Sequence, residues 1–419
     1  MSKYSRSSAV KTPTQNEGTQ NPSIPSPLKE PALAEATQDD LQVLDIDVVL
    51  LTNYLRRHHT VACQEIQKRV RKLTVLLSVP MEPDRNWEAD WGELDVVLQK
   101  NRMFTTKWKH STGFSEQNFI HFPTDTTAQL KRLQPDVILS YEMGMRTLLC
   151  SAYRLLRPRC RLVMVGNMSQ HVEAERGLIR RTFRNIIKRG CDHFTYNGPS
   201  CRRYLKSLKI SDDKLHHFPY CIDEDTVYHG PRNTPHPSLR KMIYCGSLSS
   251  RKGILQFAIA ARNWCDANPD QKIELTIAGT GELQLEISDL GSANFQIEFL
   301  GNCDLEGLRL AYRNADLCVF PSLADEWGLV PIEAMASGLP VLGSFYAQSV
   351  ETHVTEGESG WVFCTDDDLQ IEAAIDRAMQ VQPDELLKMG RAAKAAVSGI
   401  SPAASAESIC QLIKAIASK

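Results

Sequence analysis

The sequence lacks a long apolar run, a cluster of cysteines and a strong net charge. Its 419 residues contain no apolar stretch near the ~20 residues that a membrane-spanning helix requires. The twelve cysteines are scattered, with no C-x-x-C pair, so neither a zinc site nor a disulfide framework is indicated. The net charge of −2 gives no overall attraction to nucleic acid or membranes. We expect a cytoplasmic protein with reduced thiols, no secretory signal peptide and no nucleic-acid partner.

The sequence also lacks a G-x-x-x-x-G-K-[ST] loop, which disfavours phosphoryl transfer by a P-loop. Apolar residues at 42% and charged residues at 23% are typical of globular proteins. A chain of this length is long for a single core and favours two domains.

The chain divides into four segments. Residues 1–42 are rich in Ser, Thr, Pro, Gln and Asn, which predicts a disordered tail. Residues 43–230 and 231–400 form two blocks, and the polar, proline-bearing stretch 230–241 between them is typical of a linker. Residues 401–419 predict a C-terminal helix that could pack back on the first block.

Both blocks alternate short apolar runs, typical of buried strands, with amphipathic segments typical of helices. The predicted strands are 47–55, 73–79, 95–100, 135–141, 161–167, 193–198, 242–248, 273–279, 295–301, 316–322, 339–345 and 359–363. This alternation favours an α/β protein with two Rossmann-like, doubly wound domains that face each other across a cleft. Ligands of such sheets bind beyond the carboxyl ends of the strands.

The stretch LADEWGLVPIEAMASGLP (323–340) follows one of these strands. Pro331 suits the first turn of a helix, which therefore starts near Gly328. Gly338 suits the left-handed residue beyond the helix end, and Pro340 stops continuation. The N–H groups at such a helix start can bind a phosphate.

Three acidic residues surround this helix start. Asp325 and Glu326 lie in the loop ahead of it, and we expect Glu333 in its first turn. The acids could cap the helix and favour its dipole, or they could contact a ligand. The residue types alone leave both interpretations open.

Two further loops of the second block follow strands. Arg251 and Lys252 lie between a strand and a helix, where they could meet a diphosphate or remain solvated surface charges. Gly279 and Gly281 form a lone G-x-G, which is weak evidence for a nucleotide and is more typical of a plain turn.

The order of these loops resembles that of the family 4 glycosyltransferases of the GT-B fold, from about Met242 to Met379. The matching motifs are G-x-L-x-x-x-K-G (246–253), AGTGE (278–282), FLG (299–301), AD…FPS (315–322), E-x-x-S-G-W (356–361) and the E-x7-E region around 325–333. The resemblance implies a retaining, metal-independent transferase with no cofactor. Such an enzyme moves a sugar from a nucleotide diphosphate donor to the hydroxyl of a carbohydrate or lipid-linked acceptor, as in polysaccharide biosynthesis.

The resemblance also implies roles for individual residues. Asp325 would contact the sugar hydroxyls and Glu333 the ribose, while Lys252 would neutralise the diphosphate. The implied donor-binding set is Gly246, Ser247, Arg251, Lys252, Gly279, Gly281, Glu282, Asp325, Glu326, Trp327, Gly328, Leu329, Val330 and Glu333.

Two positions depart from the family pattern. The first acid is Asp325 rather than Glu, so it reaches one methylene less far, and Glu326 could substitute for it. Ser247 stands where the family often has Arg, and we hypothesise that Arg251 restores that charge.

The first block carries weaker signals. Asn53, Tyr54, Glu142 and Gly144 follow predicted strands and are acceptor-side candidates by position only. His58 and His59 share this standing. His171 follows another strand and is a catalytic candidate, although a lone loop histidine is more often structural.

Charge in the first block is uneven, with fifteen Lys or Arg against three Asp or Glu between Met143 and Ile210. The segment 176–190 predicts an amphipathic helix that carries Arg176, Arg180, Arg181, Arg184 and Lys188. Its basic face could be simply solvated, or residues 176–189 could dock on an anionic membrane.

Two other functions compete with glycosyl transfer. The same fold could serve a sugar-nucleotide epimerase or a phosphorylase, although no acid/base pair or cofactor lysine stands in a convincing setting. A non-catalytic protein that binds a glycan or a partner would also explain the weakened pattern at Asp325 and Ser247.

Overall fold

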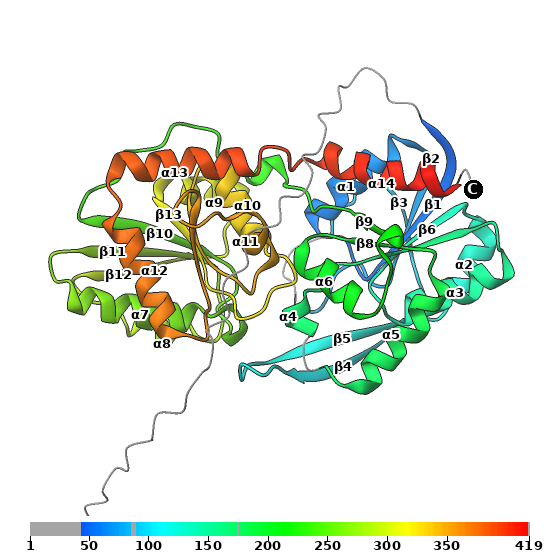
Figure 1. The fold of residues 1–419 in the computed structure, drawn as a ribbon, viewed down its shortest axis with the longest axis horizontal. Helices are drawn as coiled ribbons and strands as arrows, with labels where there is room; N and C mark the ends of the chain where they lie inside the picture. Colours follow the sequence, from blue (N-terminus) through cyan, green and yellow to red (C-terminus); the bar gives the residue numbers. More distant parts are fainter. Residues whose placement is uncertain (1–42, 85–88, 174–175, 418–419) are drawn as a thin grey trace, which may run out of the picture.

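The computed structural model describes residues 43–84, 89–173 and 176–417. These residues form two α/β domains that lie side by side (Figure 1). Each domain is built around one parallel sheet, as the alternation of strands and helices predicted. The segment predicted to be a disordered tail, 1–42, lies outside the described residues.

The first sheet has the strand order β3-β2-β1-β6-β7-β8-β9, and its pairs are all parallel. Its strands are β1 (Leu44–Thr52), β2 (Val70–Leu77), β3 (Asp95–Leu98), β6 (Val137–Tyr141), β7 (Arg161–Val165), β8 (His193–Tyr196) and β9 (Leu215–His217). The helices of this domain are α1 (Arg57–Gln67), α2 (Thr126–Leu133), α3 (Met145–Leu156), α4 (Gln170–Glu173), α5 (Leu178–Gly190) and α6 (Pro199–Ser207). Sequence patterns predicted all of these strands except the very short β9.

The second sheet has the order β12-β11-β10-β13-β14-β15 and is also parallel. Its strands, all predicted, are β10 (Leu239–Cys245), β11 (Lys272–Ala278), β12 (Phe295–Gly301), β13 (Leu317–Phe320), β14 (Val341–Ser344) and β15 (Gly360–Phe363). The helices are α7 (Ile254–Ala267), α8 (Gln284–Ser288), α9 (Leu305–Asn314), α10 (Leu329–Ala336), α11 (Gln348–His353), α12 (Asp368–Gln380), α13 (Pro383–Ala396) and α14 (Pro402–Ala417).

The apolar runs of the second domain are explained by burial on both faces of the sheet. Successive side chains of β10 point to opposite faces. Met242 joins a buried cluster that contains Phe257 of α7, whereas Ile243 joins a different cluster that contains Met335 of α10. Because helices cover both faces, a strand here needs apolar residues at nearly every position.

The last helix, α14, returns from the second domain and packs on the first (Figure 1). Ile413 of α14 shares a buried cluster with Ile66 of α1. The Ser408 hydroxyl donates to the carbonyl of His217, at the end of β9, over 2.6 Å. The two domains are therefore joined by a second passage of the chain as well as by the segment between β9 and β10.

A hairpin in the first domain was not predicted either. Between β3 and α2 the chain forms an antiparallel hairpin of β4 (Asn101–Lys109) and β5 (Ser115–Pro123). Most β4 side chains are exposed, so the strand carries no apolar run that the sequence patterns could reveal. The hairpin extends from the first domain toward the second (Figure 1).

We expect Ile413→Ala to lower the free energy of unfolding by about 2–5 kcal/mol, because the side chain is fully buried between α14 and the first domain. Urea denaturation would measure the loss. Gln411→Ala, on the exposed side of the same helix, is the matched control and should change stability by less than about 0.5 kcal/mol. Equal stabilities of the two variants would contradict this role for α14.

Candidate functional site

Two loops of the second domain lie against each other at the carboxyl ends of β10 and β11. The Leu248 N–H donates to the carbonyl of Thr280 over 3.0 Å. A Cβ atom at Gly281 would come within 2.4 Å of the Leu248 carbonyl, and one at Gly279 within 1.9 Å of the Gly246 carbonyl. The G-x-G pair is therefore required for contact between the loops. Two other predicted donor-site residues, Ser247 and Glu282, are exposed.

The loop after β13 leads into α10, which begins at Leu329, where the sequence predicted a helix start. Gly328 has a φ of 86°, and a Cβ atom there would lie 2.8 Å from the ring of Phe320. Gly338 has a φ of 78° just beyond the helix end, as predicted. One prediction is wrong: because α10 begins at Leu329, Glu333 lies in its second turn and not in its first.

Asp325 forms the centre of a charged cluster ahead of α10. Its Oδ2 accepts a hydrogen bond from Lys252 Nζ over 2.5 Å and lies 3.5 Å from Arg251 Nη1. All three side chains are at most one-fifth exposed, with values of 16–20%. Burial alone would raise the pKa of Asp325, but the two cations hold it at about 2. The predicted first acid and the predicted cations thus meet in one place.

Glu326, the next residue, faces the first domain instead. Burial raises its pKa to about 7, and the negative charges of Glu142 and Glu173 add to this effect. Arg56, in the loop after β1, opposes it. Glu326 therefore does not share the environment of Asp325. This difference argues against the idea that Glu326 could substitute for Asp325.

Glu333 lies beside the segment that connects the domains. Burial raises its pKa to about 7, against a lowering effect of the Thr226 hydroxyl, and the nearby charge of Asp223 raises it further. Both of these neighbours precede β10, so the environment of Glu333 is built from the connecting segment as well as from α10.

The indole of Trp327 packs against residues of both domains. Its ring stacks on Tyr220, with centroids 5.5 Å apart, and meets His353 edge to face at 5.8 Å. A Cβ atom at Gly198 of the first domain would lie 2.9 Å from the indole. The side chain is 4% exposed, so a ligand would contact Trp327 through its backbone.

His171 reaches from α4 of the first domain to the same loop. Its Nε2 lies 2.8 Å from the carbonyl oxygen of Leu323, so Nε2 carries the proton and donates. The ring stacks on Tyr346, with centroids 4.0 Å apart. Burial lowers the pKa of His171, which keeps the imidazole neutral near pH 7. The structure thus places His171 in contact with Leu323, which lies two residues before Asp325 in the chain.

The acceptor-side candidates lie at the carboxyl ends of the neighbouring strands β1 and β6. Asn53 accepts a hydrogen bond from Arg146, and the Tyr54 hydroxyl accepts one from Arg56 over 2.8 Å. Glu142 is exposed and has a φ of 67°, which is unusual for a residue other than glycine. Gly144 precedes the first residue of α3.

His58 and His59 of α1 do not join these residues. Their rings contact the ring of Tyr220 and, for His59, that of Tyr141, in a small cavity next to the connecting segment. Burial holds the pKa of His59 at about 3. Both imidazoles are therefore neutral and belong to the packing around the connecting segment.

The predicted basic helix, α5, turns much of its charge inward. The Arg184 guanidinium is 3% exposed and lies 2.6 Å from Glu173, which also pairs with Arg180 at 3.1 Å. Lys188 donates to the carbonyl of Leu208. The expectation of a solvated basic face is therefore wrong for Arg184 and Lys188, because Glu173 and a carbonyl of the first domain act as their partners.

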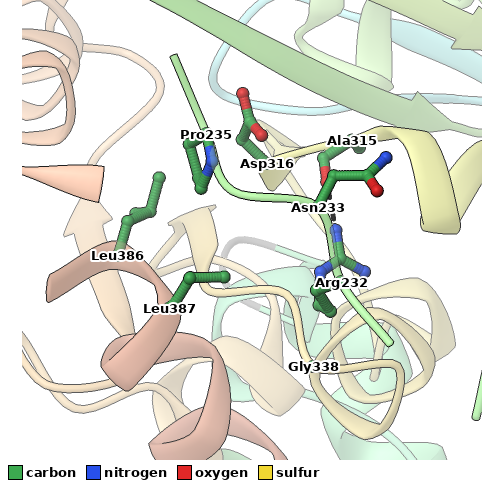
Figure 2. Close-up of a pocket in the computed structure, with 8 residues that line it drawn as sticks. All are labelled: Arg232, Asn233, Pro235, Ala315, Asp316, Gly338, Leu386 and Leu387. Atoms are coloured by element: carbon green, nitrogen blue, oxygen red, sulfur yellow. Dashed lines mark hydrogen bonds between the residues drawn. The ribbon is translucent and has the colours of Figure 1, made fainter. Parts of the chain in front are cut away.

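A second cavity lies in the second domain, below the start of β13 (Figure 2). Arg232 enters it from the segment predicted to be a linker and donates to the carbonyls of Tyr312 and Ser337 over 3.0 and 3.2 Å. This part of the predicted linker is thus bound to the domain. None of the predicted site residues lines the cavity. It lies at the start of β13, whereas Asp325 follows the end of that strand.

In residues 43–84, 89–173 and 176–417, no group of three or more His, Cys, Asp or Glu side chains could hold a metal ion. Among the helices of these same residues, none has both the length and the apolar composition needed to cross a membrane.

Residues 232–396 match the family model for glycosyl transferases group 1, and the match includes the loops after β10, β11 and β13. An uncharacterised glycosyltransferase of Methanocaldococcus jannaschii is 30% identical over 143 residues, which are 33% of this chain and 36% of that protein. A phosphatidyl-myo-inositol mannosyltransferase of Mycobacterium leprae is 31% identical over 129 residues, or 30% of this chain and 34% of that protein. The matches to these relatives cover about a third of their length.

Solved structures resemble a much larger part of the chain. Sucrose-phosphate synthase from Thermosynechococcus elongatus superposes with a TM-score of 0.64 at 15% identity, covering 88% of this chain and 99% of that one. The Anabaena protein HepE in complex with UDP gives 0.66 at 14% identity, with 88% and 100% covered. The predicted GT-B arrangement of two Rossmann-like domains is confirmed.

The raised pKa of Glu333 predicts a loss of stability on going from acid to neutral pH. In the unfolded chain the carboxyl titrates near 4.5, but in the fold it titrates at about 7, so the unfolded chain releases its proton first. The free energy of unfolding therefore falls between these two pH values. We expect Glu333→Gln to lose less stability than the wild type between pH 5 and pH 8.

Urea denaturation at the two pH values would measure this difference. Glu358→Gln is the matched control, because this side chain is exposed and the substitution should leave the pH dependence unchanged. A Glu333→Gln variant with the pH dependence of the wild type would show that the carboxyl is not in the environment described.

Proposed function

We propose that this protein is a family 4 glycosyltransferase that transfers a sugar, with retention, from a nucleotide diphosphate donor to a hydroxyl acceptor. The observation that carries the proposal is the cluster of Asp325, Lys252 and Arg251 at the start of α10. Two cations beside a helix N-terminus suit a diphosphate, and a carboxylate suits sugar hydroxyls. The match of residues 232–396 to glycosyl transferases group 1 supports this assignment.

The ion pair between Lys252 and Asp325 gives each residue a partner before the donor binds. We propose that the diphosphate replaces Asp325 as the partner of Lys252, and that the released carboxylate accepts hydrogen bonds from the sugar. Lys252 and Arg251 then stabilise the negative charge that develops on the departing nucleotide. In this mechanism the chain's own cations do this work without a metal ion.

The other donor contacts follow from the positions around this cluster. The free N–H groups from Trp327 to Val330 face the diphosphate at the helix start. Glu333, beside Thr226, accepts hydrogen bonds from the ribose hydroxyls. His171 holds the Leu323 carbonyl and so fixes the loop on which Asp325 lies.

The acceptor binds on the first domain in this proposal. Glu142, with its strained backbone, and Glu326, which faces Glu142 and Arg56, are the groups best placed to accept its hydroxyl hydrogens. We therefore assign Glu326 to the acceptor site and not to the donor site. The similar protein of Mycobacterium leprae is a phosphatidyl-myo-inositol mannosyltransferase, which supports an acceptor rich in hydroxyls, either carbohydrate or lipid-linked.

A lipid-linked acceptor would bring the protein to a membrane surface. The exposed side of α5 offers Ile179 and Ile186, which are 90% and 51% exposed, together with the exposed Arg189, one helical turn beyond Ile186. Apolar and basic side chains on one helix face suit the surface of an anionic bilayer. We include peripheral membrane contact through this face in the proposal.

A thermal-shift screen with UDP-, GDP- and ADP-sugars tests the donor site. We expect one nucleotide to raise the melting temperature, since a hundredfold excess over the dissociation constant adds ~2.7 kcal/mol of stability. Lys252→Ala and Glu333→Ala should abolish the shift, whereas Lys272→Ala, an exposed residue of β11, should retain it. No shift with any nucleotide sugar would overturn the enzyme assignment in favour of a binding protein.

A transfer assay with the same donor separates the remaining chemistry. Loss of donor sugar only when an acceptor is present supports the transferase. Conversion of the sugar without any acceptor would instead identify a sugar-nucleotide epimerase.

Vesicle flotation at low salt tests the membrane contact. We expect the protein to float with vesicles that contain phosphatidylserine and not with pure phosphatidylcholine vesicles, because the α5 face carries positive charge. The double substitution Ile179→Ser and Ile186→Ser should abolish flotation. Wild-type protein that stays in the bottom fraction of the gradient with anionic vesicles would contradict the proposed membrane contact.

A further inference from the structure

The turn of the β4–β5 hairpin is anchored on the loop that carries Asp325. Phe114, in the turn, shares a buried cluster with Leu323 and Ala324 of the second domain. The ring of His110 stacks on Phe114, with centroids 4.8 Å apart, and the His110 N–H donates to the Phe114 carbonyl over 2.9 Å. The hairpin thus carries a rigid turn across from the first domain to the donor loop.

Glu116 follows this turn on β5 and pairs in register with Trp108 of β4. Its Oε1 accepts a hydrogen bond from Arg251 Nε over 2.7 Å. The Nη1 of Arg251 donates to the carbonyl of Ala324 over 2.9 Å. The guanidinium is therefore held at two points, one from each domain.

We propose that Glu116 is a positioning residue for the donor diphosphate, which it affects by fixing the guanidinium of Arg251. This inference rests on the proposed function of the charged cluster. Glu116 itself lies on the first domain and need not touch the donor. The contact between Glu116 and Arg251 makes the donor site of the second domain depend on the β4–β5 hairpin of the first domain.

The geometry indicates that Glu116 positions the Arg251 guanidinium and does not compete with the diphosphate for it. The hydrogen bonds to Glu116 and Ala324, and the longer one of 3.5 Å to Asp325, use Nε and Nη1 of Arg251, and within the described residues its Nη2 donates none. The outer edge of the guanidinium therefore remains available to an anion. A free arginine side chain would lose rotamer entropy on binding an anion, and the contact with Glu116 removes part of that cost in advance.

Calorimetric titration of UDP, GDP and ADP, together with donor kinetics, tests the role of Glu116. We expect Glu116→Ala to raise the dissociation constant of the nucleotide that binds, and the KM for its sugar donor, by about tenfold, the range of one charged hydrogen bond. The value of kcat should fall as well, because a displaced Arg251 would stabilise the charge on the departing nucleotide less well. Glu116→Gln, which keeps an acceptor oxygen, should recover part of the affinity.

A double-mutant cycle separates positioning from general destabilisation. Because Glu116 acts through Arg251, the double variant Glu116→Ala/Arg251→Ala should bind no more weakly than Arg251→Ala alone. Gln117→Ala, the exposed neighbour on β5, is the matched control and should bind like the wild type. Wild-type affinity in Glu116→Ala, or independent losses that multiply in the double variant, would overturn the inference.

The same experiment distinguishes this inference from the proposed function. If the wild type binds a nucleotide and Lys252→Ala does not, the donor site stands whatever Glu116→Ala does. If the wild type binds none of the three nucleotides, the proposed function and the role of Glu116 both fail. A lowered melting temperature of Glu116→Ala with unchanged affinity would assign the pair to domain docking alone and overturn the positioning role.

Discussion

The ion pairs of Asp325 with Lys252 and Arg251 determine how the loops at the start of α10 are built. Charges that are this deeply placed are costly unless each has a partner, so the loops after β10 and β13 must stay together. The backbone follows this constraint: the Leu323 N–H donates to the Arg251 carbonyl over 2.8 Å. A Cβ atom at Gly253 would lie 2.0 Å from the carbonyl of Pro321. The loops therefore form one preorganised surface at the start of α10.

Two adjacent acids in this surface have opposite electrostatic environments. Cations hold the pKa of Asp325 at about 2, whereas burial among other acids raises that of Glu326 to about 7. The backbone between them turns one side chain to each domain, and Gln348 fixes that turn by donating to the Glu326 carbonyl. A carboxylate that stays charged and a carboxyl that can hold a proton near neutral pH are thus set side by side, as separate donor and acceptor groups require.

The sequence predicted the regular part of this architecture because regular strands leave periodic patterns. Parallel strands buried on both faces appear as apolar runs, and Gly328 and Gly338 mark the ends of α10 by their backbone requirements. The β4–β5 hairpin left no such trace because its side chains are mostly exposed. The role of Glu116 could not be predicted from the sequence either. Its partner Arg251 is 135 residues away, and only the fold brings the two together. The inward basic side chains of α5 likewise depend on partners outside the helix, Glu173 for Arg184 and the Leu208 carbonyl for Lys188.

Several contacts between the domains surround the charged cluster. His171 donates to the Leu323 carbonyl, Glu116 holds Arg251, and the Gln348 side chain accepts from the Cys201 N–H of the first domain over 2.8 Å. Separation of the two domains would break these three contacts together, because they surround one charged cluster. In the proposed function, a donor that needs Asp325 and Arg251 in place also depends on these contacts. Donor binding and this arrangement of the domains would then favour each other.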